Sequence, residues 1–218
     1  MMREAVRSQK EAPADEPVVI IVDDDADLRD ALANLLGSVG LKVSTFGSAA
    51  AMLDSELPNA PSCLVLDIRL PGISGLEFQC QLARSGVRLP IVFMTGHGDI
   101  PMSVKAMKAG AVDFLTKPFR DQDMIDAVSN AIERDRGRRQ ADGALDSVRE
   151  LYKSLTPRES ELMWFVTKGL LNKQIAAAMG LAEITVKIHR GNMMKKMGVT
   201  SVAELTRLAA VLGIHGTG

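Results

Sequence analysis

The most constraining feature of this 218-residue sequence is a series of short strand-like runs, each followed by a polar residue with functional chemistry. The runs lie at 18–22, 63–66, 91–94 and 113–116, and the residues that follow them are Asp23-Asp24, Asp67, Thr95 and Lys117. Continuous apolar runs of this length are typical of parallel strands that are buried on both faces. Ligands of an open α/β sheet bind outside the carboxyl ends of its strands. We therefore expect three carboxylates, a hydroxyl and an ammonium to meet at one sheet edge, which suits a phosphoryl group bound with Mg²⁺.

Strand and helix patterns alternate through the first part of the chain. A further strand is expected at 42–46, and apolar residues at helical spacing follow each strand. Five such units predict a doubly wound α/β domain over residues 18–130. Residues 1–17 mix both charge signs with Pro and Ala and lack the apolar core of a signal peptide, so we interpret them as a disordered leader.

Residues 131–153 are rich in charge and predict a helical linker. Gly137 and Gly143 are its weak points, while Leu145, Val148 and Leu151 form an apolar stripe. Two interpretations remain open for this segment: it pairs with its copy in a dimer, or it is a solvated linker without a partner.

Residues 154–218 predict an all-α domain of four helices. Thr156-Pro157-Arg158-Glu159 is a capping-box start. The apolar face of this helix is expected to consist of Leu162, Trp164, Phe165 and Val166. Asn172 is expected to cap the second helix, and the turn Gly180-Leu181 precedes a third at 183–197. Two short helices joined by a tight turn, with a fourth helix at 201–212, predict a helix-turn-helix domain.

Charge is distributed unevenly along the chain. Residues 1–149 carry 17 Lys and Arg against 22 Asp and Glu, whereas residues 150–218 carry 9 against 5. An acidic first part and a basic second part favour a metal or phosphate site followed by a nucleic-acid-binding module. No apolar run approaches the ~20 residues of a membrane span, and we expect a cytoplasmic protein without a membrane partner.

The residue types at the sheet edge predict a magnesium site. Mg²⁺ takes oxygen ligands in octahedral geometry, commonly from one or two carboxylates and from phosphate. We expect Asp24, Asp67 and the backbone carbonyl of Arg69 as direct ligands, with Asp23 acting through water. Asp67 is the expected nucleophile, which would become an acyl phosphate. Lys117 would neutralise one phosphoryl oxygen, and the Thr95 hydroxyl would donate a hydrogen bond to another.

Four motifs resemble the receiver domain of two-component response regulators: VDDD (22–25), LDIRLPGISG (66–75), MTGHGD (94–99) and DFLTKPF (113–119). The segment GHGDIPMSVKAMKAGAVDF is similar to the FixJ subgroup. The resemblance implies a flavodoxin-like (βα)5 fold and phosphotransfer from a histidine kinase to Asp67. It also implies that Thr95 and Phe114 couple the phosphoryl group to a surface change over 102–108 and 114–115. A cis Lys117-Pro118 bond is expected, and His97 is expected to tune dephosphorylation.

The second domain resembles the LuxR/NarL/FixJ-type helix-turn-helix, through LTPRE, NKQIA and TVKIHRGNMMKKM. On the third helix a buried stripe is expected at Val186, His189, Met193 and Met197, while Lys187, Arg190 and Met194 point toward a groove. We assign DNA phosphate contacts to Lys173, Thr185 and Lys195, and base contacts to Lys187, Ile188 and Arg190. Ala182, Ile184 and Gly191 depart from residues frequent in the family.

These features predict a phosphorylation-dependent transcriptional regulator rather than an enzyme. Phosphorylation of Asp67 is expected to promote a homodimer on a two-fold site in double-stranded DNA. The fourth helix is expected to supply a dimer surface through Val202, Leu205, Leu208, Ala209 and Leu212, part of which must pack internally. One alternative is a receiver whose output domain binds protein. The other is an aspartyl-phosphate hydrolase of the haloacid dehalogenase type, although residues 23–27 lack the Thr or Val of that motif.

Overall fold

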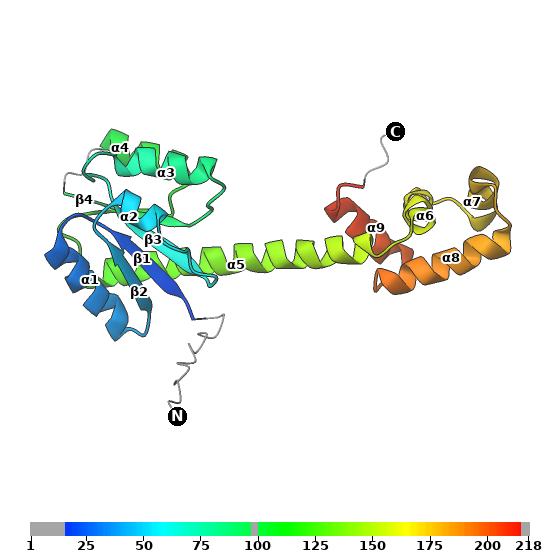
Figure 1. The fold of residues 1–218 in the computed structure, drawn as a ribbon, viewed down its shortest axis with the longest axis horizontal. Helices are drawn as coiled ribbons and strands as arrows, with labels where there is room; N and C mark the ends of the chain where they lie inside the picture. Colours follow the sequence, from blue (N-terminus) through cyan, green and yellow to red (C-terminus); the bar gives the residue numbers. More distant parts are fainter. Residues whose placement is uncertain (1–15, 97–99, 215–218) are drawn as a thin grey trace, which may run out of the picture. The chain divides into compact units, whose positions relative to one another are not determined.

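The computed structural model describes residues 16–96 and 100–214, which form two compact units. The first unit ends at Arg139 and the second begins at Gln140. Most of the expected leader (residues 1–15) and His97 lie outside the described residues. Figure 1 shows the elements of each unit.

A five-stranded parallel sheet forms the centre of the first unit. Its strand order is β2-β1-β3-β4-β5, and the strands are β1 (Val18–Val22), β2 (Lys42–Phe46), β3 (Ser62–Asp67), β4 (Ile91–Thr95) and β5 (Asp113–Thr116). The expected bounds are confirmed for β1, β2 and β5. Strand β4 runs one residue beyond the end of the apolar pattern, and β3 extends one residue beyond it at each end. Asp67 and Thr95 are therefore the last residues of their strands.

Helices cover both faces of this sheet. One face packs on α2 (Ala49–Leu53), α3 (Gly75–Arg84) and α4 (Ile100–Lys108), around the fully buried rings of Phe78 and Phe93. The other face packs on α1 (Ala26–Ser38) and the first part of α5 (Asp121–Lys153), around Leu36, Met94 and Met124. The two groups of helices lie on opposite sides of the sheet in Figure 1. This arrangement confirms the predicted flavodoxin-like α/β fold.

Helix α5 is continuous from Asp121 to Lys153 and is not interrupted at Gly137 or Gly143. Each glycine costs a helix only about 1 kcal/mol relative to Ala. The rest of the segment consists largely of good helix formers, and the helix carries (i, i+3) ion pairs that support it. These pairs are Arg136–Glu133, Arg149–Asp146 and Lys153–Glu150.

The second unit contains the predicted four helices after the end of α5: α6 (Pro157–Thr167), α7 (Asn172–Met179), α8 (Glu183–Lys196) and α9 (Val202–Val211). Its core is a single cluster built around Leu162, Met163, Ile175, Val186 and Met193. Among the described residues, no helix of either unit is long and apolar enough to cross a membrane.

The prediction for the apolar face of α6 was wrong at one position. Trp164 is 39% exposed, and Met163 is fully buried in the core instead. The Trp164 ring packs edge-on against Phe165 and has the Lys168 ammonium 5.5 Å from its centroid. Apolar residues at every position from 162 to 166 hide the helical period, so the sequence does not distinguish Trp164 from Met163.

One further prediction for this unit was wrong. The N-cap of α7 is Leu171 and not Asn172, and the Gln174 side chain accepts a hydrogen bond from the Leu171 amide at 2.8 Å. Part of the α9 stripe packs internally, as expected, since Leu205 and Ala209 are buried in the core of their own domain. The other three members of the stripe are partly buried against the same cluster, and they are Val202, Leu208 and Leu212. The dimer surface on α9 stays a prediction.

Candidate functional site: an acidic cluster and a DNA-binding helix

Three carboxylates meet at the carboxyl edge of the sheet. Asp23 and Asp24 follow β1, and Asp67 ends the neighbouring strand β3. One oxygen from each carboxylate lies within 4.8 Å of the others; Asp23 and Asp67 are buried, whereas Asp24 is exposed. Asp25 is engaged elsewhere, because its side chain caps α1 by accepting hydrogen bonds from the amides of Asp27 and Leu28. The cluster thus has two buried carboxylates and one open to solvent.

Lys117 connects the two buried carboxylates. Its Nζ lies 2.7 Å from Asp23 Oδ2 and 3.5 Å from Asp67 Oδ1. The backbone holds this residue in place, since the Lys117 amide donates to the Thr95 carbonyl at 2.7 Å. The expected cis Lys117-Pro118 bond is confirmed. One ammonium is therefore shared between two acidic groups that lie on adjacent strands.

The environment of Asp67 disfavours its negative charge. Burial raises the pKa of Asp67 most, and the nearby Asp23 carboxylate raises it further. Lys117 and a hydrogen bond from the Arg69 backbone lower the pKa but do not fully compensate. A divalent cation would relieve this excess of negative charge, and three carboxylates are a donor set that fits Mg²⁺. The role of the Arg69 carbonyl as a further ligand stays a prediction.

Thr95 and Phe114 lie on β4 and β5, the two strands on one side of β3. Thr95 is buried at the end of β4, where the Ile68 amide donates to the neighbouring Met94 carbonyl at 3.0 Å. Phe114 lies in β5 opposite Phe93 of β4, and its ring is partly buried on the face covered by α4. The carboxyl ends of four strands and the loops that follow them thus hold all the predicted residues, namely Asp23, Asp24, Asp67, Thr95 and Lys117.

Gly75 is a site residue that the sequence analysis missed. A Cβ atom at this first position of α3 would lie 2.5 Å from the Asp67 carbonyl oxygen and 3.0 Å from the Ile68 Cα. The Gly75 amide donates to the Ile68 carbonyl at 2.8 Å. Glycine permits this close approach because it has no side chain. The sequence does contain a signal for this close approach, which is a glycine at the first position of a helix, directly after the N-cap Ser74.

In the second unit, α8 has one exposed stripe. The residues share helical spacing of i, i+3, i+4, i+7 and i+11, and they are Ile184, Lys187, Ile188, Gly191 and Lys195. Three predicted DNA contacts lie on this stripe. Lys173 on α7 is also exposed, and Thr185 is half-buried beside the stripe.

Two α8 residues differ from the predicted orientation. Arg190 is half-buried, and its Nη1 donates to Asn172 Oδ1 on α7 at 2.9 Å. Met194 is also half-buried and packs on the core of the unit rather than facing a groove. The Asn172 side chain, which does not cap α7, instead orients the guanidinium of Arg190.

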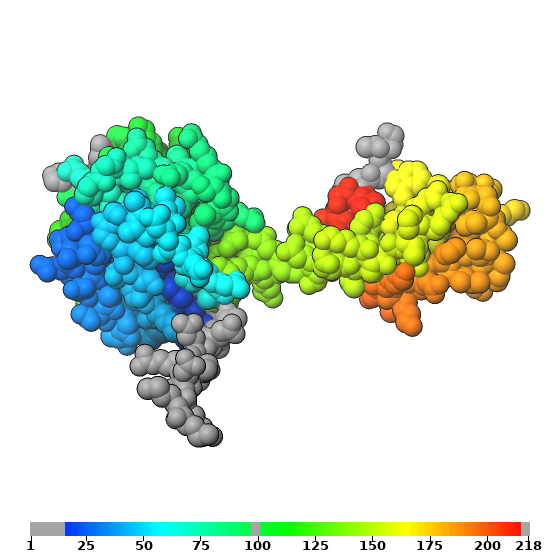
Figure 2. All heavy atoms as spheres, viewed as in Figure 1, coloured from blue at the N-terminus to red at the C-terminus, as the bar shows by residue number. Residues whose placement is uncertain are grey.

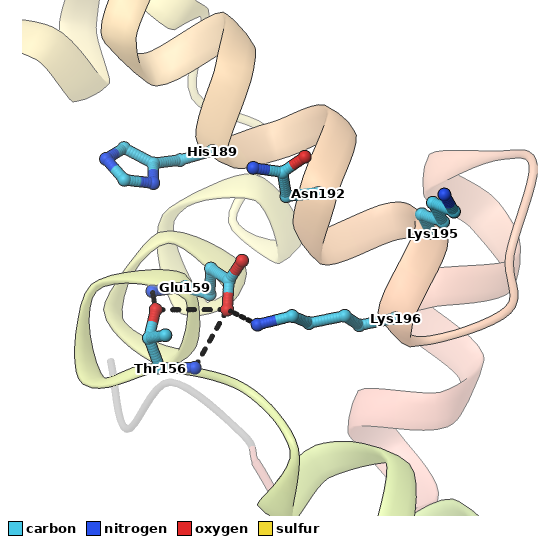
Figure 3. A pocket seen from close by; sticks show the side chains of 6 residues that line it. All are labelled: Thr156, Glu159, His189, Asn192, Lys195 and Lys196. Carbon is cyan, nitrogen blue, oxygen red and sulfur yellow. Dashed lines mark hydrogen bonds and ion pairs between the residues drawn. The ribbon is translucent and has the colours of Figure 1, made fainter.

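An open pocket of about 630 Å³ lies between α8 and the start of α6 (Figure 3). His189 of α8 lines this pocket and is half-buried, so it is not part of the fully buried stripe that was expected. At the pocket floor Glu159 accepts hydrogen bonds from the Thr156 amide at 2.8 Å and from Lys196 Nζ at 2.6 Å. Burial alone would raise the pKa of Glu159, but the hydrogen bonds from Lys196 and Thr156 outweigh it and lower that pKa. The ion pair fastens α8 to α6.

The parallel sheet and its acidic edge define a receiver domain, and the helical unit that follows it defines a DNA-binding output domain. The family model of the response regulator receiver domain matches residues 19–129, and that of the bacterial regulatory proteins of the luxR family matches residues 153–209. The chain belongs to the two-component response regulators with a LuxR-type DNA-binding domain. The resemblance found in the sequence is thereby confirmed, and the family consists of transcription regulators rather than enzymes.

Relatives match nearly end to end. Nodulation protein W of Bradyrhizobium diazoefficiens is 57% identical over 197 residues, which cover 90% of this chain and 87% of the relative. The transcriptional regulatory protein FixJ of Azorhizobium caulinodans is 43% identical, with coverage of 93% and 95%. Among solved structures, the low-resolution structure of the response regulator StyR has a TM-score of 0.82 and 48% identity, covering 89% of this chain and 98% of that one.

Proposed function

We propose that Asp67 accepts a phosphoryl group from a partner histidine kinase, and that this modification promotes dimerisation and sequence-specific DNA binding. The observation that carries the proposal is Lys117 Nζ, which lies within 3.5 Å of both buried carboxylates. From this position the Lys117 ammonium can exchange its contact with Asp23 for a contact with a phosphoryl oxygen on Asp67 by a short side-chain movement. We place this activity in the cytoplasm, where the protein can meet both the phosphohistidine of the kinase and the target DNA.

In the transfer step, a carboxylate oxygen of Asp67 attacks the phosphorus of a phosphohistidine. A P–O bond forms, the P–N bond breaks, and the imidazole of the kinase leaves and takes up a proton. Asp24, Asp67 and the Arg69 carbonyl would hold Mg²⁺ directly and Asp23 would hold it through water, and the bound ion would supply charge neutralisation. Lys117 pairs with one phosphoryl oxygen, and the Thr95 hydroxyl donates to another.

The output follows from Thr95 and Phe114. Movement of the Thr95 hydroxyl toward the phosphoryl group frees space that the half-buried Phe114 ring occupies. This changes the surface formed by α4 and β5, where Val104 and Met107 are 45% and 46% exposed. Exposed apolar side chains of this size suit a contact with a second copy of the domain.

The LuxR-type domain then binds a two-fold DNA site as a dimer. Phosphate contacts are assigned to Lys173, Thr185 and Lys195, and base contacts to Lys187, Ile188 and Arg190. Four of these six residues are exposed in the structure. To reach a base edge, the Arg190 side chain must either break its hydrogen bond with Asn172 or move together with the Asn172 side chain.

The proposal is tested by the mass of the full chain in solution with Mg²⁺, with and without beryllofluoride, for wild type and for Asp67→Asn. Beryllofluoride stands in for the phosphoryl group. We expect a monomer that becomes a dimer only in the wild type with beryllofluoride. A dimer in every condition, or one formed by Asp67→Asn, would contradict the switch at Asp67. DNA binding is checked by its salt dependence, because phosphate contacts release counterions.

A further inference from the structure

Helix α8 exposes two large aliphatic side chains on a surface that is otherwise polar. Ile184 is 64% exposed and Ile188 is 57% exposed, and neither belongs to the hydrophobic cluster of the unit. Residues at i and i+4 are neighbours on a helix surface, with Cβ atoms about 5–6 Å apart. The two side chains therefore form one small apolar patch in the N-terminal half of the helix.

The surroundings of this patch favour nucleic acid as its occupant. Lys187 lies on the same exposed stripe, Lys195 follows two turns later, and Lys173 is exposed on α7. An apolar protein surface would have to desolvate these ammonium groups without compensation, whereas DNA phosphates pair with them. At Gly191, one turn beyond Ile188, nothing lies within 4 Å of where a Cβ would stand. The helix backbone can therefore approach a groove closely at that point.

Arg190 is drawn away from the stripe. Its Nη1 donates to Asn172 Oδ1 at 2.9 Å, which turns the guanidinium toward α7. While Asn172 holds Arg190, the side chains in the N-terminal half of the exposed stripe that can face a base edge are the aliphatic pair and Lys187. In the major groove, the apolar feature of a base edge is the 5-methyl group of thymine.

We propose that Ile184 and Ile188 determine sequence specificity by reading the 5-methyl groups of two thymines in each half-site. This inference rests on the proposed function of the second unit in DNA binding. Bases rise about 3.4 Å per step on one strand, so side chains about 5–6 Å apart meet thymines at neighbouring or next-but-one steps. Ile184 contacts one methyl group and Ile188 the other. Each buried methyl contributes about fourfold in affinity.

The test uses the full chain with Mg²⁺ and beryllofluoride. Duplexes are first selected from a random library, and each thymine of the selected half-site is then replaced by deoxyuridine, which removes only the methyl group. We expect about fourfold weaker binding of the wild type at two positions. In Ile184→Ala the penalty disappears at one of these positions, and in Ile188→Ala at the other. The matched control is Val211→Ala on α9, which alters an equally exposed aliphatic residue and keeps both penalties.

The outcomes separate the two levels of the proposal. Salt-dependent binding with equal affinity for thymine and deoxyuridine duplexes would overturn the methyl readout and leave DNA binding intact. Selection of a half-site without thymine would do the same. A uniform loss in Ile184→Ala, with both deoxyuridine penalties retained, would assign that residue a structural role and overturn its part in recognition. Absence of any salt-dependent DNA binding by the wild type would overturn the proposed function itself.

Discussion

The Asp135 carboxylate on α5 accepts a hydrogen bond from the backbone amide of Ser62, with Oδ2 and the amide nitrogen 2.9 Å apart. Ser62 begins β3, the strand that ends at Asp67. Asp135 is fully buried and also pairs with Arg138 and Arg139. Arg139 in turn donates to the Pro58 carbonyl at 3.2 Å. A buried carboxylate thus fixes α5 to the strand of the proposed phosphoacceptor, at the opposite end from the site.

Replacing Asp135 by Asn should destabilise the receiver by about 2 kcal/mol, because charge-assisted hydrogen bonds are lost from a buried position. Far-UV circular dichroism during urea unfolding of the full chain should show an earlier transition. The single Trp164 and the single Tyr152 lie in the second unit, so their fluorescence transition should not move. Asp146→Asn is the control, since that carboxylate forms an exposed pair on the same helix. Equal stability of the Asp135 and Asp146 variants would contradict this prediction.

The contribution of Asp135 should depend on pH. Burial alone would raise the pKa of Asp135, but hydrogen bonds from Arg139, Arg138 and the Ser62 amide outweigh it and lower that pKa. A lowered native pKa contributes stability above the ordinary value of about 4, and this stability is lost as the pH falls through the native pKa.

The difference in unfolding free energy between wild type and Asp135→Asn should therefore be constant near neutral pH and shrink below about pH 4. Urea titrations at several pH values measure this difference. If the difference in unfolding free energy widens on acidification, the fold does not stabilise the ionised form of Asp135.

Gly75→Ala should damage the receiver, because the added Cβ would lie 2.5 Å from the Asp67 carbonyl oxygen. We expect a loss of about 1–3 kcal/mol from the forced backbone shift, together with slower phosphorylation of Asp67. The control is Gly37→Ala in α1, where nothing lies within 4 Å of the new atom and the change should stabilise by about 0.5–1 kcal/mol. Urea unfolding followed by circular dichroism measures the change in unfolding free energy for each variant. If both substitutions change it in the same direction, the tight approach at Gly75 is ruled out.

Ala182→Ser should stabilise the DNA-binding unit. Ala182 is the N-cap of α8 and makes no side-chain capping bond, so a serine hydroxyl would satisfy an amide of the first turn and gain about 1 kcal/mol. Trp164 fluorescence during urea unfolding of the full chain reports on this unit. Ala177→Ser, an exposed position inside α7, is the same chemical change at a helix interior and should destabilise slightly. Destabilisation by both changes would mean that α8 does not begin at Glu183.

The sequence predicted the receiver fold and the acidic edge because both depend on local patterns. Asp67 and Lys117 follow strand-like runs, and parallel strands place such positions together whatever fills the core. Asp135 was missed because its Ser62 partner lies 73 residues away, and a carboxylate in a charge-rich segment looks like part of a solvated helix. Asn172 was taken for a cap because Asn commonly caps helices, whereas here its side chain meets Arg190 of the next helix.

The most direct test of the central claim is the site of phosphorylation. The full chain is incubated with Mg²⁺ and a small acyl-phosphate donor, and the modified residue is located by mass spectrometry. We predict one phosphoryl group on Asp67 in the wild type and in Asp25→Asn, a control that keeps a good cap for α1. We predict none in Asp67→Asn, or without Mg²⁺. A phosphoryl group that persists in Asp67→Asn, or that maps to another residue of the wild type, would contradict the assignment of Asp67 as the acceptor.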